Sequence, residues 1–131
     1  MSAMQKVAWF NLAVVLLSLG AVLSLLPIVG TQRAQAGLAI LGLFGLNPLF
    51  LRRKRGRAVF DERDTLIQRR SVIVAYTIFW VAMFGVSGLA ALVYGLDGSV
   101  PVEVILVFPA YAAMVLLAAM SVATLVQYGW R

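Results

Sequence analysis

The chain has 131 residues, of which 63% are hydrophobic and 12% are charged, with a formal net charge of +6. Soluble domains have about 45–50% apolar and about 25% charged residues, so this composition excludes an ordinary water-soluble domain and favours a protein that lies in lipid. Since there is no cysteine and no histidine, disulfides, thiolate or imidazole metal sites and catalysis by either residue type are excluded as well. We therefore expect an all-α integral membrane protein that is not an enzyme and needs no cofactor or metal.

The first apolar segment runs from about residue 7 to 29 and follows Lys6. About 20 consecutive apolar residues are needed for a helix to cross the hydrocarbon core, so this segment is long enough. A cleaved signal peptide is the alternative, because Ala34-Gln35-Ala36 resembles a small-residue cleavage site. The apolar part of a signal peptide has only about 7–15 residues, however, which favours a spanning helix.

The second apolar segment covers about residues 34–51 and is the shortest and least regular of the set. It contains Gly37, Gly42 and Gly45, and Asn47-Pro48 stands near its end. Because proline removes a backbone donor and clashes with the preceding turn, we expect a second helix with a kink late in its course.

The third and fourth helices are predicted at about residues 61–95 and 102–128. The third begins before its apolar part and forms a cytoplasmic extension, and it ends at the turn signal Asp97-Gly98. The fourth contains Pro109, where we expect a bend.

Lysine and arginine are distributed unequally among the connections. Eight of the eleven lie in the loop 52–70, and Lys6 and Arg131 lie on the same side of the membrane, whereas only Arg33 lies on the other. Because cytoplasmic loops carry an excess of these residues, we expect both termini and this loop in the cytoplasm. The predicted architecture is a four-helix bundle of two antiparallel hairpins in the inner (cytoplasmic) membrane.

The loop 52–70 carries most of the charged side chains of the chain. A basic run is followed by Asp61-Glu62-Arg63-Asp64, in which Asp61 is a good N-cap for the third helix. Lysines and arginines next to a membrane-spanning segment fix the orientation of the protein in the membrane. They also attract anionic lipids, with a binding free energy of about 1 kcal/mol per charge. Docking of a cytoplasmic protein is the sharper alternative, and nucleic acid is disfavoured because only charge supports it. The candidate contact residues are Arg52, Arg53, Lys54, Arg55, Arg57, Asp61, Glu62, Arg63, Asp64, Arg69 and Arg70.

The three acids of this loop could hold Mg²⁺ only together with further oxygen ligands, because that ion demands six. The other acids of the chain, Asp97 and Glu103, are expected on the opposite side of the membrane. Neutralisation by the neighbouring arginines is the favoured interpretation of the acidic cluster.

The layout of this sequence resembles a known family. An apolar hairpin, a basic loop with Asp61-Glu62-Arg63-Asp64 followed by Ile67 and Arg69-Arg70, and a second apolar hairpin resemble small prokaryotic membrane proteins of the DUF2178 type. In that family a DERD-x-x-I-x-x-R/K element lies between the second and third helices. The resemblance implies four helices and a structural or docking role for Asp61, Arg63 and Asp64. It implies no activity, because the family has none established.

Between the predicted membrane interfaces there is no Asp, Glu, Lys or Arg, which disfavours ion-coupled transport. Small residues at four-residue spacing allow close approach of helices in lipid, either within the bundle or between copies in a homo-oligomer. The residues predicted to pack in this way are Gly20, Ser24, Ser87, Ala91, Gly95, Ala119 and Ala123.

These observations lead to three functional hypotheses. The first is a regulatory, scaffold or assembly subunit that contacts anionic lipid or a partner protein through its basic loop. The second is a homo-oligomeric channel or facilitator built around the second helix. The third is an enzyme acting on lipid headgroups.

Overall fold

The computed structural model describes residues 2–50, 62–95 and 98–129. Within them every element is helical, which confirms the predicted all-α class. The elements in chain order are α1 (Ala3–Ala34), the 3₁₀ helix η1 (Gln35–Leu46), α2 (Asn47–Phe50), α3 (Glu62–Tyr94) and α4 (Val102–Tyr128).

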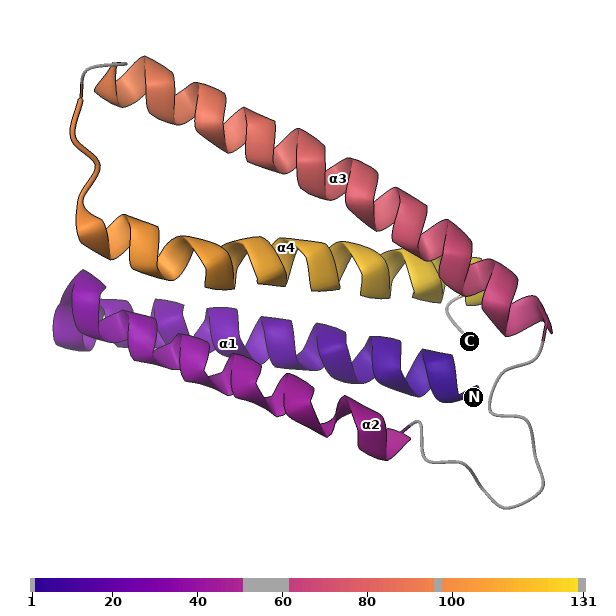
Figure 1. The fold of residues 1–131 in the computed structure, drawn as a ribbon. Coiled ribbons are helices and arrows are strands. Elements are labelled where there is room, and N and C mark those ends of the chain that lie inside the picture. The colour runs from indigo at the N-terminus through magenta and orange to yellow at the C-terminus, as the bar shows by residue number, and fades with distance from the viewer. Residues whose placement is uncertain (1, 51–61, 96–97, 130–131) are drawn as a thin grey trace.

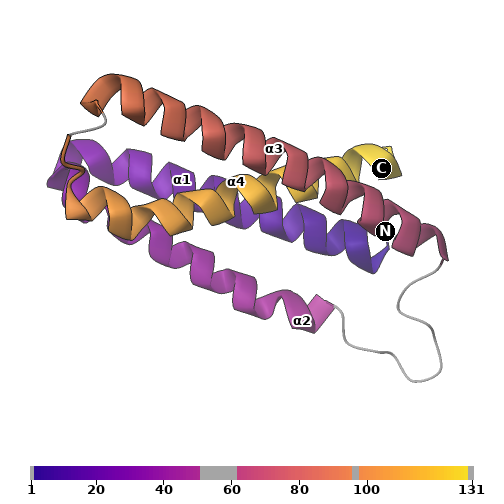
Figure 2. The same cartoon turned by 45° about the horizontal axis from the view of Figure 1, so that its top comes forward.

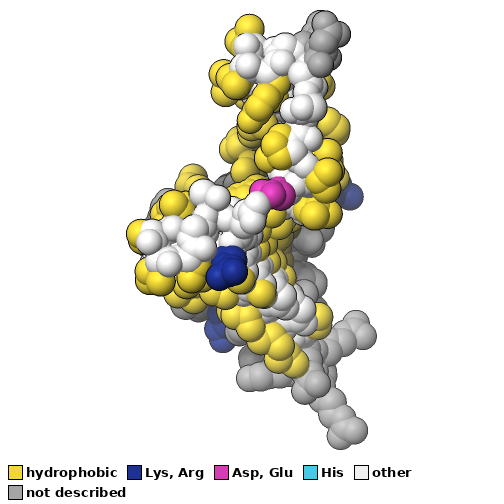
Figure 3. All heavy atoms as spheres, turned by 90° about the vertical axis from the view of Figure 1, so that its left-hand side faces the viewer, with side chains coloured by type: hydrophobic (Ala, Val, Ile, Leu, Met, Phe, Trp, Pro, Cys, Tyr) yellow, Lys and Arg dark blue, Asp and Glu magenta, His cyan; other side chains and the backbone are white. Residues whose placement is uncertain are grey.

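Three helical stretches of the described chain are long and apolar enough to cross a membrane, namely Ala3–Leu49, Glu62–Tyr94 and Val102–Tyr128. Many of their large hydrophobic side chains face outward: Leu92 is 83% exposed and Ile28 is 76% exposed. Figure 3 shows hydrophobic side chains over much of the visible surface, with few charged ones among them. An apolar surface of this kind is suited to lipid and not to water.

The helices lie side by side, with α4 between α3 and α1, and α1 packs in turn against η1 (Figures 1 and 2). The start of α1, the start of α3 and the end of α4 lie at the same end of the molecule (Figure 1). We call this end, which includes Ser2, Glu62 and Gly129, the basic end. The opposite end, which includes Gly30 and Pro101, is called the Gly30 end.

The first helix begins at Ala3, four residues before the predicted start. Ser2 is its N-cap: the Gln5 backbone N–H donates to Ser2 Oγ (3.2 Å), and the Ser2 backbone N–H donates to Gln5 Oε1 (2.8 Å). This reciprocal capping box satisfies two donors that would otherwise lack partners at the helix start. Its signature, a serine three residues before a glutamine, is present in the sequence.

The chain reverses its direction at Gly30, within the range assigned to α1. Gly30 has φ 81° and ψ 171°, a backbone conformation that residues with a Cβ rarely adopt. The prediction placed four residues, 30–33, in this connection, whereas in the structure the helical backbone resumes at Thr31. Residues 31–50, which we call the arm, then run back along the first part of α1 (Figure 1).

The second helix, predicted over 34–51, is helical in the structure over 34–50, but its residues 35–46 form the 3₁₀ helix η1 and not an α-helix. The arm packs tightly on α1: a Cβ added at Gly37 would lie 2.8 Å from the Val22 backbone nitrogen. Ser18 Oγ donates to the Gly37 carbonyl oxygen at 3.1 Å. A 3₁₀ helix is narrower than an α-helix, and the glycines of this segment lower its α-helical propensity, so the arm can lie this close to α1.

The contact between α3 and α4 is concentrated near the basic end. All the buried residues of α3, which are Ile67, Ser71 and Ala75, lie there. Towards the Gly30 end α3 diverges from α4 (Figure 1), and its residues are exposed or half-buried. A groove lies between the two helices on the side of the basic end, and its lining comes from residues 70–78 of α3 and 115–127 of α4.

Candidate functional site

The structure describes part of the predicted contact surface. Arg52, Arg53, Lys54, Arg55, Arg57 and Asp61, including the predicted N-cap, lie outside the described residues. Glu62, Arg63 and Asp64 form the first turn of α3, and Arg69 and Arg70 follow two turns later. Acids in a first helical turn interact favourably with the positive end of the helix dipole, which accounts for Glu62 and Asp64 at this position.

Asp64 is tied to the other end of the chain. Its Oδ1 accepts a hydrogen bond from the Tyr128 hydroxyl, which comes from the last turn of α4. Both side chains are half-buried between the two helices. A hydrogen bond to an ionised acceptor is stronger than one between neutral groups, so this contact fixes the start of α3 against the end of α4.

A second hydrogen bond links the same two helices one layer deeper. Gln127 Nε2 donates to Ser71 Oγ at 2.9 Å and to the Ala123 carbonyl oxygen at 3.2 Å. Ser71 is fully buried. Because an unsatisfied polar group is costly where water is excluded, the pairing of Ser71 with Gln127 stabilises the α3–α4 contact.

The arginines of this segment behave differently from Asp64. Arg63, Arg69 and Arg70 are all exposed, and no ion pair or hydrogen bond joins them to the other described residues. The neighbouring acid Asp64 is engaged with Tyr128. The basic end therefore presents positive charge outward while its half-buried acid holds the helices together.

We expect Tyr128→Phe to lower the stability of the purified protein by about 1 kcal/mol, because the Asp64 carboxylate loses its donor while staying half-buried. The melting temperature in detergent measures this loss and should fall by a few degrees. Tyr76→Phe is the matched control, since the Tyr76 side chain is 54% exposed. Equal melting temperatures for both variants would contradict a stabilising role for the Asp64–Tyr128 contact.

The predicted packing residues fall into two groups. Ala119 and Ala123 are half-buried and line the groove between α4 and α3. The others, Gly20, Ser24, Ser87, Ala91 and Gly95, are exposed in the described chain. Ser24 Oγ donates only to the carbonyl oxygen of Gly20 in its own helix, at 2.7 Å. Packing of these exposed faces stays a prediction, because no other described helix covers them.

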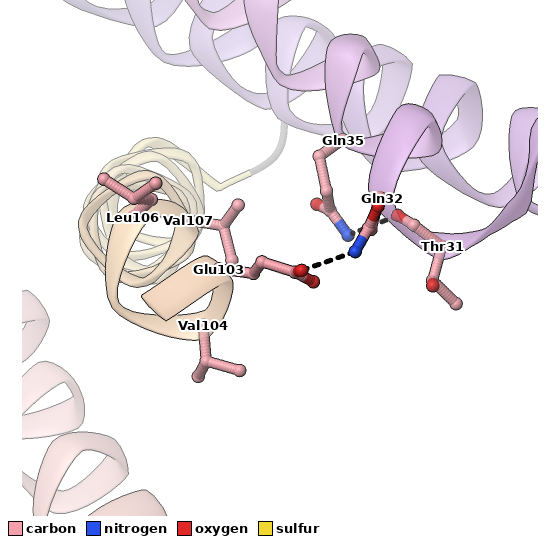
Figure 4. Close-up of a pocket in the computed structure, with 7 residues that line it drawn as sticks. All are labelled: Thr31, Gln32, Gln35, Glu103, Val104, Leu106 and Val107. Atoms are coloured by element: carbon pink, nitrogen blue, oxygen red, sulfur yellow. Dashed lines mark hydrogen bonds between the residues drawn. The ribbon is translucent and has the colours of Figure 1, made fainter. Parts of the chain in front are cut away.

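A cleft of about 490 Å³, with both polar and apolar lining residues, lies at the Gly30 end between α1 and the start of α4. Glu103 extends from α4 towards Gln32 and accepts a hydrogen bond from its Nε2 (Figure 4). The Tyr111 hydroxyl donates to Gln35 Oε1 at 2.8 Å. These two hydrogen bonds join α4 to the start of the arm. The polar residues of the cleft therefore have a structural role in holding these two segments together. No described cluster of acids, here or at the basic end, brings three potential metal ligands together.

Sequence reasoning identified the charged segment but missed its partners. Tyr128 and Gln127 were not among the residues predicted for this site, because they are distant in the sequence from Asp64 and Ser71. The sequence did contain a signal for these contacts: both residues carry hydrogen-bond donors, and both lie at the end of a helix predicted to return to the side of the charged segment. Glu103 with Gln32 was likewise missed, because the two are distant in the sequence.

The apolar length of the helices and their outward-facing hydrophobic side chains place this chain among helical membrane proteins. The sequence matches no protein-family model, no curated protein and no solved structure. The resemblance to the DUF2178 type therefore stays a prediction, carried by the motif that begins at Asp61.

Proposed function

We propose that this chain is a non-enzymatic multi-pass protein of the inner membrane that acts as a regulatory, scaffold or assembly subunit. It crosses the membrane four times, the arm being the second crossing, and both termini and the loop 52–70 lie in the cytoplasm. The excess of lysine and arginine at this end supports that orientation. The loop and the first turns of α3 form its working surface.

One observation carries this proposal. The half-buried Asp64 accepts a hydrogen bond from the Tyr128 hydroxyl, whereas the side chains of Arg63, Arg69 and Arg70 are exposed. If Asp64 only balanced the charge of these three arginines, it would pair with one of them and not with Tyr128. A rigid helix start that keeps guanidinium groups free is suited to bidentate recognition of carboxylates or phosphates.

The proposed partner is a cytoplasmic protein with an acidic surface, and charge reversal tests this. We expect a soluble protein to co-purify in fixed stoichiometry with the wild-type chain and to bind about tenfold more weakly, or not at all, to Arg69→Glu. The reason is that like charges placed together across an interface are strongly unfavourable. Mass determination of the solubilised complex measures the stoichiometry.

Arg33→Glu is the matched control, because it makes the same charge change at an exposed position near the Gly30 end. If both variants retain the same partner as the wild type, or both lose it, the basic end is not its docking surface.

A homo-oligomeric channel or facilitator is the second candidate, and the arm is the observation that favours it. No atom lies within 4 Å of a Cβ built at Gly42 or Gly45, so one face of η1 is open. Asn11 and Asn47 each have a buried carboxamide oxygen without a partner in the described structure. Flux of ions or solutes through proteoliposomes, together with a defined oligomer and no soluble partner, would support this candidate over the first.

A further inference from the structure

The groove between α3 and α4 has an apolar body and a basic rim. It has a volume of about 860 Å³, within the range of roughly 300–1,000 Å³ that is typical of ligand pockets. Its floor on α4 combines three alanines, Ala118, Ala119 and Ala123, with three valines, and its wall on α3 includes Ile73 and Ile78. Small side chains opposite branched ones leave room for an apolar occupant.

The rim of the groove is polar and lies at the basic end. Arg70 and Gln127 line the groove and also line a smaller pocket of about 250 Å³, whose further lining includes Arg63. Arg63 and Arg70 are seven residues apart, and residues at that spacing lie on the same face of a helix. Two exposed guanidinium groups therefore flank the entrance to an apolar groove.

The extent of the groove along the helices matches one leaflet of a bilayer. On α4 it runs from Val115 to Gln127, which corresponds to about 18 Å of helix. The hydrocarbon core is about 30 Å thick, so each leaflet contributes about 15 Å. An acyl chain of the adjacent leaflet has about this length, so the groove can hold one along its whole extent.

We propose that this groove binds one anionic phospholipid, with its phosphate between Arg63 and Arg70 and an acyl chain along the apolar groove. Charge complementarity selects the anionic headgroup, since Asp64 is engaged with Tyr128 and leaves the two guanidinium groups free. Arginine binds phosphate oxygens through paired N–H donors, which gives the site its geometry. The proposal rests on the membrane placement proposed above, which puts the basic end at a headgroup layer.

Native mass spectrometry of the solubilised full chain, titrated with phosphatidylglycerol or phosphatidylcholine, tests this site. We expect one phosphatidylglycerol per chain, bound about tenfold more tightly than phosphatidylcholine, and about tenfold weaker binding for Arg70→Gln. Arg69→Gln is the matched control: it removes the same charge from the neighbouring residue, which lines neither the groove nor the smaller pocket. It should leave the affinity unchanged.

A second pair of variants tests the apolar part without changing any charge. Ala119→Phe fills the groove and should abolish the preference for phosphatidylglycerol, whereas Ala113→Phe, at an exposed position of α4 outside the groove, should preserve it. Equal affinity for the two lipids, or equal loss with Arg69→Gln and Arg70→Gln, would overturn the proposal. A dimer that Ala119→Phe abolishes would assign the groove to a second copy and overturn it as well.

Failure of the lipid site is separable from failure of the proposed function. The partner experiment depends on Arg69, which lies outside the groove, and the lipid experiment depends on Arg70 and Ala119. The orientation of the chain is measured independently by the labelling experiment described below.

Discussion

A cysteine introduced at Thr31 should react with a membrane-impermeant maleimide added to intact spheroplasts, whereas a cysteine at Gln68 should react only after the membrane is opened. Both side chains are exposed in the structure, so accessibility to the reagent depends on the side of the membrane. The chain contains no cysteine, and each variant therefore carries a single thiol. In intact spheroplasts we expect near-complete labelling of the Thr31→Cys variant and only background labelling of the Gln68→Cys variant.

This pair of positions also counts the membrane crossings. Thr31 is the first residue of the arm, and Gln68 follows the arm in the chain. If the arm crosses the membrane, the two positions lie on opposite sides; if it does not, they lie on the same side and label alike. A cysteine at Ser99, which is exposed between α3 and α4, should label with Thr31. Equal labelling of Thr31 and Gln68 variants would reduce the structure to three crossings and overturn the proposed orientation of the loop 52–70.

Sequence reasoning was most successful where one physical requirement dominates. A backbone in lipid must satisfy its own hydrogen bonds, so long apolar runs without alternation predict helices, and the structure has them. The need for internal backbone hydrogen bonds applies to every residue of an apolar run, so about 20 positions together indicate a helix. The class of helix and the ends of the helices depend on fewer residues, and those predictions were less accurate.

The errors in the fold come from contacts between segments. The choice between an α-helix and a 3₁₀ helix over 35–46 depends on how closely Gly37 lies to Val22, and the sequence does not specify which residues of α1 face the arm. The reversal at Gly30 was predicted in position but not in length, because one left-handed residue can replace a longer loop. The capping box of Ser2 and Gln5, in contrast, was legible in the sequence.

At the basic end the sequence provided the charged residues but not their roles. Asp64 and its neighbouring arginines look like a self-neutralising cluster when only local spacing is considered. In the structure Asp64 binds Tyr128, from the last turn of α4, and the arginines stay exposed. The different roles of Asp64 and the arginines result from the α3–α4 contact, because that contact brings Asp64 next to Tyr128, a residue distant in the chain.

Replacement of Gly37 by leucine should destabilise the protein more than any other single change in the arm. Even a Cβ at this position would lie 2.8 Å from the Val22 backbone nitrogen and 3.1 Å from the Ala21 carbonyl carbon, and backbone atoms cannot move aside as a side chain can. Overpacking of this kind typically costs about 1–3 kcal/mol. The melting temperature of the variant in detergent should fall accordingly. Gly42→Leu, where no atom lies within 4 Å of the added Cβ, is the matched control and should leave it near the wild-type value.

A double-mutant cycle shows whether the loss at Gly37 comes from separation of the arm from α1. Ser18 Oγ donates to the Gly37 carbonyl oxygen at 3.1 Å, and Ser18→Ala alone should cost about 0.5–1.5 kcal/mol. If Gly37→Leu separates the two segments, that hydrogen bond is already broken, and Ser18→Ala then adds little in the double variant. Full additivity would mean that the arm stays in place despite the leucine. In that case the close approach at Val22 would not be what holds the arm against α1.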